Sequence, residues 1–174
     1  MGAGRVRRLD HPSGNLGVAG CFLALLRAAP EAAARFAFCD QDDVWLPGKA
    51  GRAARALEGV PAGVPALYCA RQTMVDCDLQ RLGVSPGAKR GPALANALVQ
   101  NIATGCTVVL NGAARRIALA VPPPPPTLHD WWAYLVVTAA GGRVVFDEEP
   151  VILYRQHGGN AVGGNASRLV RAAR

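Results

Sequence analysis

The fold of this chain is decided by residues 35–43, RFAFCDQDD. The apolar and aromatic run at 35–39 is typical of a buried strand. It ends abruptly in three carboxylates, Asp40, Asp42 and Asp43. Helical spacing of apolar residues predicts a helix at 16–29, closed by Pro30, and a second helix at 47–57. The strand therefore lies between two helices and ends in an acidic turn.

Short apolar segments and helical patterns alternate along much of the remaining chain. We expect strands at 66–70, 72–75, 106–110, 144–146 and 151–154, helices at 92–100, 113–120 and 128–140, a loop at 83–91 and an extended proline run at 122–126. The helix at 128–140 carries one predicted apolar face: Leu128, Trp131, Trp132, Leu135, Val136 and Ala139. This order predicts a single α/β domain over residues 1–174, with a mixed, mostly parallel sheet flanked by helices. In such sheets ligands bind at the carboxyl ends of strands, which is where the acidic turn falls.

The composition limits the classes of partner. The chain has 174 residues, 51% of them hydrophobic, and a formal net charge of +7. A positive charge suits nucleic acid, an acidic membrane surface or a phosphorylated small molecule. Nucleic acid is disfavoured because no dense Lys/Arg block with interleaved aromatic residues is present. Five cysteines without CxxC spacing, no apolar run of roughly 18 residues and no secretory signal lead us to expect a cytoplasmic protein with reduced thiols.

The acidic turn has two interpretations. Three carboxylates within four residues repel one another unless a cation is present, and Mg²⁺ or Mn²⁺ would accept their oxygens and leave positions for phosphate. Alternatively, the aspartates cap backbone amides where the strand turns into the helix. The spacing alone leaves both interpretations open.

Two later segments also carry polar groups. In 127–132, TLHDWW, the residues alone favour a capping box in which Asp130 reaches back to the amide of Thr127. The alternative is that Asp130 is a general base at the mouth of a cleft. His129 lies either near a ligand or on the surface.

In 154–157, YRQH, Arg155 either contacts phosphate or pairs with a carboxylate such as Asp147. His157 beside two glycines would ordinarily be a loop residue.

These segments together resemble family 2 glycosyltransferases. FCDQDDVWLPGK at 38–49 is similar to their Asp-x-Asp segment, closest to the rhamnosyltransferase-like branch. HDWW at 129–132 resembles their late acidic motif, and YRQH at 154–157 their C-terminal motif. Residues 15–17 and 101–107 fit the same order. The resemblance spans about residues 15–165 and leaves 166–174 as a basic tail.

The resemblance implies a GT-A-like fold and an inverting, metal-dependent sugar transfer. The donor would be a nucleotide-diphosphate sugar such as dTDP-rhamnose, and the acceptor a hydroxyl of a polysaccharide or lipid-linked saccharide. Asp40, Asp43 and Arg155 would bind the donor. Asp42 and His157 would hold Mg²⁺ or Mn²⁺, and Asp130 would be the catalytic base. The basic tail would suit peripheral contact with the inner face of the plasma membrane.

The chain departs from the family pattern at its front. Family members begin with two strands and an Asp-Asp-Gly-Ser-like turn, and no such segment precedes Asn15. We therefore expect an N-terminally truncated catalytic domain. Two alternatives stay open: a catalytically inactive remnant, and a metal-dependent phosphoryl hydrolase, which would need a second group of metal ligands.

Overall fold

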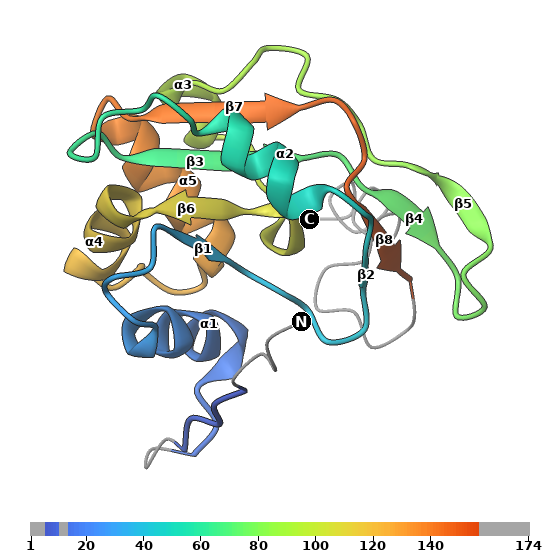
Figure 1. The fold of residues 1–174 in the computed structure, drawn as a ribbon, viewed down its shortest axis with the longest axis horizontal. Coiled ribbons are helices and arrows are strands. Elements are labelled where there is room, and N and C mark those ends of the chain that lie inside the picture. The colour runs from blue at the N-terminus through green and yellow to red at the C-terminus, as the bar shows by residue number, and fades with distance from the viewer. Residues whose placement is uncertain (1–5, 11–13, 157–174) are drawn as a thin grey trace.

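The computed structural model describes residues 6–10 and 14–156 and contains a mixed α/β domain with two four-stranded sheets and five α-helices in that part of the chain (Figure 1). The elements are α1 Gly17–Ala28, β1 Arg35–Ala37, β2 Val44–Trp45, α2 Lys49–Ala56, β3 Ala66–Ala70, β4 Thr73–Val75, β5 Arg81–Val84, α3 Leu94–Ala97, the 3₁₀ turn η1 Gly105–Thr107, β6 Val109–Asn111, α4 Gly112–Ala120, α5 His129–Ala139, β7 Arg143–Asp147 and β8 Ile152–Arg155. The α/β class is confirmed. No helix in the described ranges is long and apolar enough to cross a membrane.

The first sheet has the strand order β1-β6-β3-β7. Strand β6 is antiparallel to both of its neighbours, whereas β3 and β7 are parallel. Consequently β1, β3 and β7 all run in one direction and β6 runs against them. Val109, the first residue of β6, pairs with Ala37, the last residue of β1. Strand β6 therefore starts at the edge of the sheet where β1 ends and runs in the opposite direction.

The second sheet, in the order β2-β8-β4-β5, continues from the carboxyl ends of the first. Strand β2 follows the acidic turn after β1, β4 follows β3 after two residues, and β8 follows β7. Its β2–β8 and β4–β5 pairings are antiparallel and its β4–β8 pairing is parallel. The prediction of a mixed, mostly parallel sheet holds for the first sheet, where three of the four strands run in one direction. The expectation of one such sheet is wrong, because short returns after β1, β3 and β7 build a second sheet with two antiparallel pairings and one parallel pairing.

Most predicted elements occur within a few residues of their expected bounds. Two strands were not expected: β2, which has only two residues, and β5, part of which falls in the predicted loop at 83–91. The strand expected at 106–110 begins instead as the turn η1. The proline run at 122–126 lies outside any helix, as predicted.

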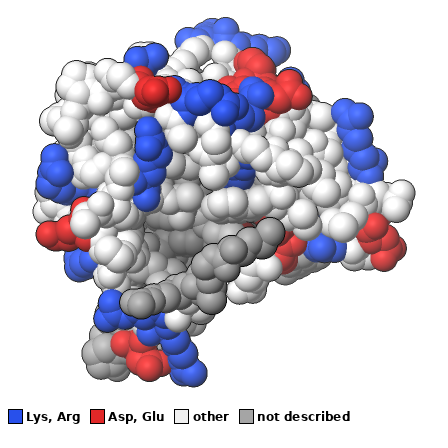
Figure 2. Space-filling view, in the orientation of Figure 1, with Lys and Arg blue, Asp and Glu red and all other residues white. Residues whose placement is uncertain are grey.

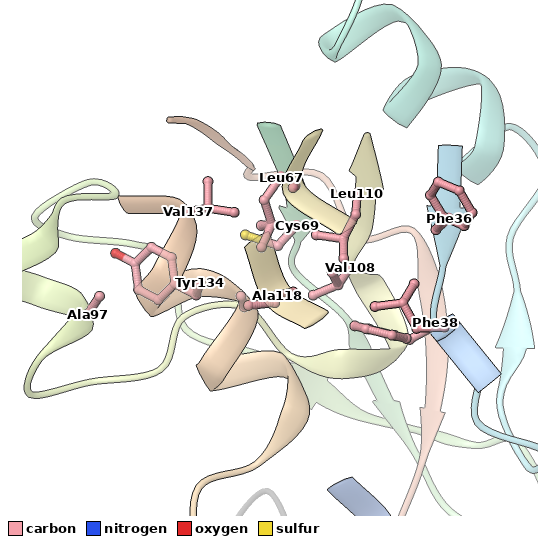
Figure 3. Close-up of a cluster of buried hydrophobic side chains, with 14 residues drawn as sticks. Phe36, Phe38, Leu67, Cys69, Ala97, Val108, Leu110, Ala118, Tyr134 and Val137 are labelled. Atoms are coloured by element: carbon pink, nitrogen blue, oxygen red, sulfur yellow. The ribbon is translucent and has the colours of Figure 1, made fainter. Parts of the chain in front are cut away.

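Strand β3 is buried on both faces. Leu67 and Cys69 belong to the larger core, which contains residues of α1, α3, α4 and α5 (Figure 3). Ala66, Tyr68 and Ala70 pack against Ala53 and Leu57 of the α2 segment on the other side. Burial on both sides explains why β3 reads as a continuous apolar run rather than an alternating one.

The predicted apolar face of α5 is not its most buried face. The buried residues of the helix are His129, Asp130, Ala133, Tyr134 and Val137. Trp131 and Trp132 are half-buried and donate their indole N–H groups to the carbonyls of Ala97 at 2.7 Å and Ala118 at 3.1 Å, while Ala139 is exposed. The reason is that α5 is covered by α1, α3, α4 and the sheet, so an apolar stripe does not mark a single buried side.

Candidate functional site

A cleft of about 690 Å³ opens where β1 ends. Its walls come from α1, residues 39–42, the turn at 104–105, the start of α5 and Tyr154. Asp40, Asp42 and Asp130 all line it, although they lie far apart in the sequence. The fold thus brings the acidic turn and the HDWW segment together, because β6 starts beside the end of β1 and η1 leads into β6.

The acidic turn contains a cluster that could hold a cation. Ligand atoms of Asp40, Asp43 and the Cys106 thiol all lie within 4.8 Å of one another. Asp43 Oδ1 accepts the backbone N–H of Arg155 at 3.0 Å, whereas its Oδ2 is buried and has no hydrogen-bond partner among the described residues. Carboxylate oxygens suit Mg²⁺ or Mn²⁺, and a thiol adds a softer ligand. These residues therefore fit a divalent cation.

The carboxyl groups of the cluster resist ionisation. Burial, followed by the charges of Asp43, Asp42 and Asp130, raises the pKa of Asp40 to about 6, although Lys49 opposes the shift. Burial also raises the pKa of Asp43, and outweighs the amide of Arg155 and the thiol of Cys106, which lower it. A bound cation would relieve this repulsion.

Lys49 is a buried cation beside the cluster, and we assigned it no role from the sequence. It is 1% exposed, its Nζ donates to the Cys106 carbonyl at 2.6 Å, and it lies 3.5 Å from the ring centroid of Trp45. Burial lowers the pKa of Lys49 to about 8. Gly48, directly before it, has a φ of 87°, the left-handed conformation from which α2 starts. The signal in the sequence was the position of Lys49 at the end of the family-like string at 38–49.

Asp130 is the second residue of α5 and is buried. Its Oδ2 accepts the backbone N–H of Gly105 at 2.8 Å, and its Oδ1 accepts that of Trp131 at 2.6 Å. The predicted capping box with Thr127 is wrong, since the residue before the helix is Leu128 and no side chain caps it. The turn at 104–107 supplies the partner in its place.

Burial raises the pKa of Asp130, even though hydrogen bonds from Trp131, Gly105 and Asn101 lower it. A raised pKa makes a carboxylate a stronger proton acceptor near neutral pH. Gly105 and Asn101 belong to residues 101–107. This segment fits the order of the family motifs, but we predicted no function for it from the sequence.

His129 is buried in an aromatic pocket next to Asp130. Its ring stacks on Phe22 at 4.1 Å between centroids and meets Phe38 edge-on at 4.7 Å. Neither ring nitrogen has a hydrogen-bond partner within the described ranges, and burial lowers the pKa of His129 to about 4. The alternative of a surface position is wrong, and the imidazole is neutral at pH 7.

Arg155 ties the YRQH segment to the acidic turn. Its Nε donates to the Asp42 carbonyl at 3.0 Å, and its Nη1 donates to the carbonyl of Cys77. It does not pair with Asp147, whose carboxylate accepts two 2.8 Å hydrogen bonds from Arg52. His157 lies outside the described residues.

No protein-family model matches the chain, and no curated protein matches it. The assignment of the cleft therefore rests on its own geometry. Within the part of the chain that the structure describes, Asp40, Asp43 and Cys106 are the one group of three or more metal-ligating side chains. A second such group, which the hydrolase alternative needs, does not occur there.

Proposed function

We propose that this chain is a GT-A-type catalytic domain, similar to family 2 glycosyltransferases, that transfers a sugar with inversion. The donor is a nucleotide-diphosphate sugar, with rhamnose as the first candidate, and the acceptor is a hydroxyl of a polysaccharide or lipid-linked saccharide. The observation that supports this proposal is the cleft in which Asp40, Asp42 and Asp130 meet. Its volume lies within the range of roughly 300–1,000 Å³ that is usual for small-molecule sites.

The acidic turn is the proposed donor end of the cleft. Asp42, with His157, is the proposed metal-binding pair, and Asp40, Asp43 and Arg155 face the donor. The buried Oδ2 of Asp43 and the thiol of Cys106 are further candidates for holding the cation. Bound Mg²⁺ or Mn²⁺ would neutralise diphosphate charge and so favour departure of the nucleotide.

Asp130 is the proposed base. Its carboxylate takes the proton of the acceptor hydroxyl while that oxygen bonds to the anomeric carbon. The bond from the anomeric carbon to the diphosphate oxygen breaks on the opposite face, so the configuration inverts and the nucleotide leaves with the electron pair. The amide of Gly105, at 2.8 Å, orients the carboxylate for this step.

One observation favours the alternative of a domain that keeps this fold without transferring sugar. Lys49 places a buried ammonium close enough to Asp40 and Asp43 to favour their ionised forms. The ammonium of Lys49 therefore partly neutralises the negative charge of the cluster, and this neutralisation needs no metal.

The experiment is calorimetric titration of the purified chain with dTDP and UDP, with and without Mn²⁺. The proposal expects nucleotide binding that requires Mn²⁺ and is lost in Asp42→Ala but kept in Asp78→Ala, a control at an exposed aspartate outside the cleft. Transfer from dTDP-rhamnose should then be abolished by Asp130→Asn while nucleotide binding persists. A folded protein that binds neither nucleotide would favour the inactive alternative, and full turnover by Asp130→Asn would refute the base.

A further inference from the structure

The short helix α3 and the residues around it form an exposed apolar surface. Leu94 is 40% exposed, Leu98 63% and Val99 77%. The neighbouring exposed residues are also apolar: Pro92, Ala93 and Ala95. We call residues 92–99 the α3 surface. Adjacent exposed apolar side chains, unlike scattered single ones, mark an interaction site.

The α3 surface is held firmly by its inner side. Ala97 is fully buried, and its carbonyl accepts the indole N–H of Trp131 at 2.7 Å. The hydroxyl of Tyr134 donates to Asn96 Oδ1 at 2.9 Å and accepts the backbone N–H of Ala93 at 3.1 Å. These anchors belong to α5, so Leu94, Leu98 and Val99 point outward from a fixed base and are not part of a loosely packed loop.

The stretch of chain that contains the α3 surface is positively charged. Lys89 and Arg90, both exposed, directly precede it, and no Asp or Glu occurs from residue 79 to residue 129. Glu148 comes close, since its carboxylate borders Gly87, but Arg71 lies 3.7 Å from it. On the face shown in Figure 2, Lys and Arg side chains are scattered, with Asp and Glu beside them, and do not form one continuous basic surface.

We propose that the α3 surface docks onto an anionic lipid surface. Leu94, Leu98 and Val99 enter the headgroup layer, and Lys89 and Arg90 contact lipid phosphates. A second copy of the chain is a poorer occupant, because it carries the same formal net charge of +7 and offers Lys89 and Arg90 no overall opposite charge.

This docking does not depend on sugar transfer, although the chain links the α3 surface to the cleft. Five residues, 100–104, separate the α3 surface from Gly105, whose amide donates to Asp130. Trp131, which holds α3 through the carbonyl of Ala97, directly follows Asp130 in α5, so one helix supports both the α3 surface and the proposed base.

The test is cosedimentation of the full chain with vesicles of phosphatidylcholine, with or without phosphatidylglycerol. We expect binding to the anionic vesicles alone. Leu98→Gln/Val99→Gln should weaken it about tenfold, because two apolar side chains leave the lipid. Lys89→Gln/Arg90→Gln should weaken it about 20-fold, and added salt should act in the same direction. The matched control is Leu82→Gln, at a 60% exposed leucine on β5, which should bind as the wild type does.

Three outcomes would overturn the proposal. Equal binding to neutral and anionic vesicles would remove the role of charge. Unchanged binding by both double variants would place the contact elsewhere, for example in the basic tail. A wild-type chain that ignores vesicles but self-associates, with Leu98→Gln/Val99→Gln monomeric, would make the α3 surface an interface between two copies.

Discussion

Gly105 and Asp130 are joined by a 2.8 Å hydrogen bond from the backbone N–H to Oδ2. The same glycine lies so close to α5 that a Cβ there would sit 3.0 Å from His129 Nε2 and 3.4 Å from Asp130 Oδ2. The hydrogen bond and the packing are therefore linked, since only a residue without a side chain lets the turn at 104–107 approach Asp130 this closely.

Replacing Gly105 with Ala should destabilise the protein by about 1–3 kcal/mol, because the added methyl group forces the His129 ring or the turn to move. Urea unfolding measures the change. Gly112→Ala is the matched control: it lies in α4, where the nearest atom to an added Cβ is the flexible end of Arg116 at 3.7 Å. That variant should gain about 0.5–1 kcal/mol from reduced unfolded-state entropy. Equal effects at the two positions would contradict the close approach.

Asp40→Asn should stabilise the metal-free protein at pH 7. Burial and three neighbouring carboxylates raise the pKa of Asp40 from 3.8 to about 6, so the folded state holds this proton more tightly than the unfolded state. The stability that the proton contributes is present below about pH 4 and lost as the pH rises through 6. We expect a gain of about 1–2 kcal/mol at pH 7, discounted for partial exposure, that disappears near pH 4.

Thermal unfolding in EDTA across pH 4–7 measures this difference, with Asp78→Asn as the control at an exposed position. Adding Mn²⁺ should stabilise the wild type more than Asp40→Asn if the cluster holds a cation. A variant less stable than the wild type at pH 7 would show that the carboxylate is a net stabiliser.

Tyr68→Phe tests whether the hydrogen bonds to the Asp147 carboxylate stabilise the fold without affecting the candidate site. The Tyr68 hydroxyl donates to Asp147 Oδ2 at 2.8 Å, and Arg52 occupies both oxygens of the same carboxylate. Removing the hydroxyl should cost about 1 kcal/mol in urea unfolding. Binding of dTDP with Mn²⁺ should not change, because neither residue lines the cleft. A variant that folds normally but binds the nucleotide more weakly would show that this network supports the site.

The sequence predicted the strand at 35–39 and the carboxylates after it because an apolar run followed by clustered charges is a local pattern. Which carboxylates come together depends on residues that are far apart in the sequence. Asp43 meets Cys106, and Asp40 meets Asp130 across the cleft, because β6 inserts in reverse between β1 and β3. No periodicity marks that reversal, so the pairing with η1 and the role of Gly105 could not be predicted.

Lys49 and α5 show a second limit of prediction from the sequence, which concerns the burial of polar residues. A lysine at a helix start is ordinarily solvated, whereas this one lies 3.5 Å from the ring centroid of Trp45 and donates to the carbonyl of Cys106, far away in the sequence. In α5, apolar spacing located the helix, but its most buried positions include His129 and Asp130. Burial of polar residues depends on partners in α1 and the turn at 104–107, and those partners become neighbours only in the folded chain.

His129→Leu should change the acid stability of the protein in the direction opposite to Asp40→Asn. Burial lowers the pKa of His129 from 6.5 to about 4, so between these values the unfolded state binds the proton more tightly. The wild type should therefore lose stability at this residue as the pH falls from 6.5 to 4, by up to about 3 kcal/mol. Leucine cannot be protonated and leaves no unpaired nitrogen in the pocket between Phe22 and Phe38.

The measurement is the difference in unfolding free energy between the wild type and His129→Leu across this pH window. The variant should gain relative to the wild type as the pH falls, whereas the advantage of Asp40→Asn should shrink over nearly the same range. The two variants thus separate two titrations that partly cancel in the wild type. A constant difference for His129→Leu would mean that the imidazole is protonated as readily in the folded protein as in the unfolded chain, which requires a hydrogen-bond acceptor or water at its ring nitrogens.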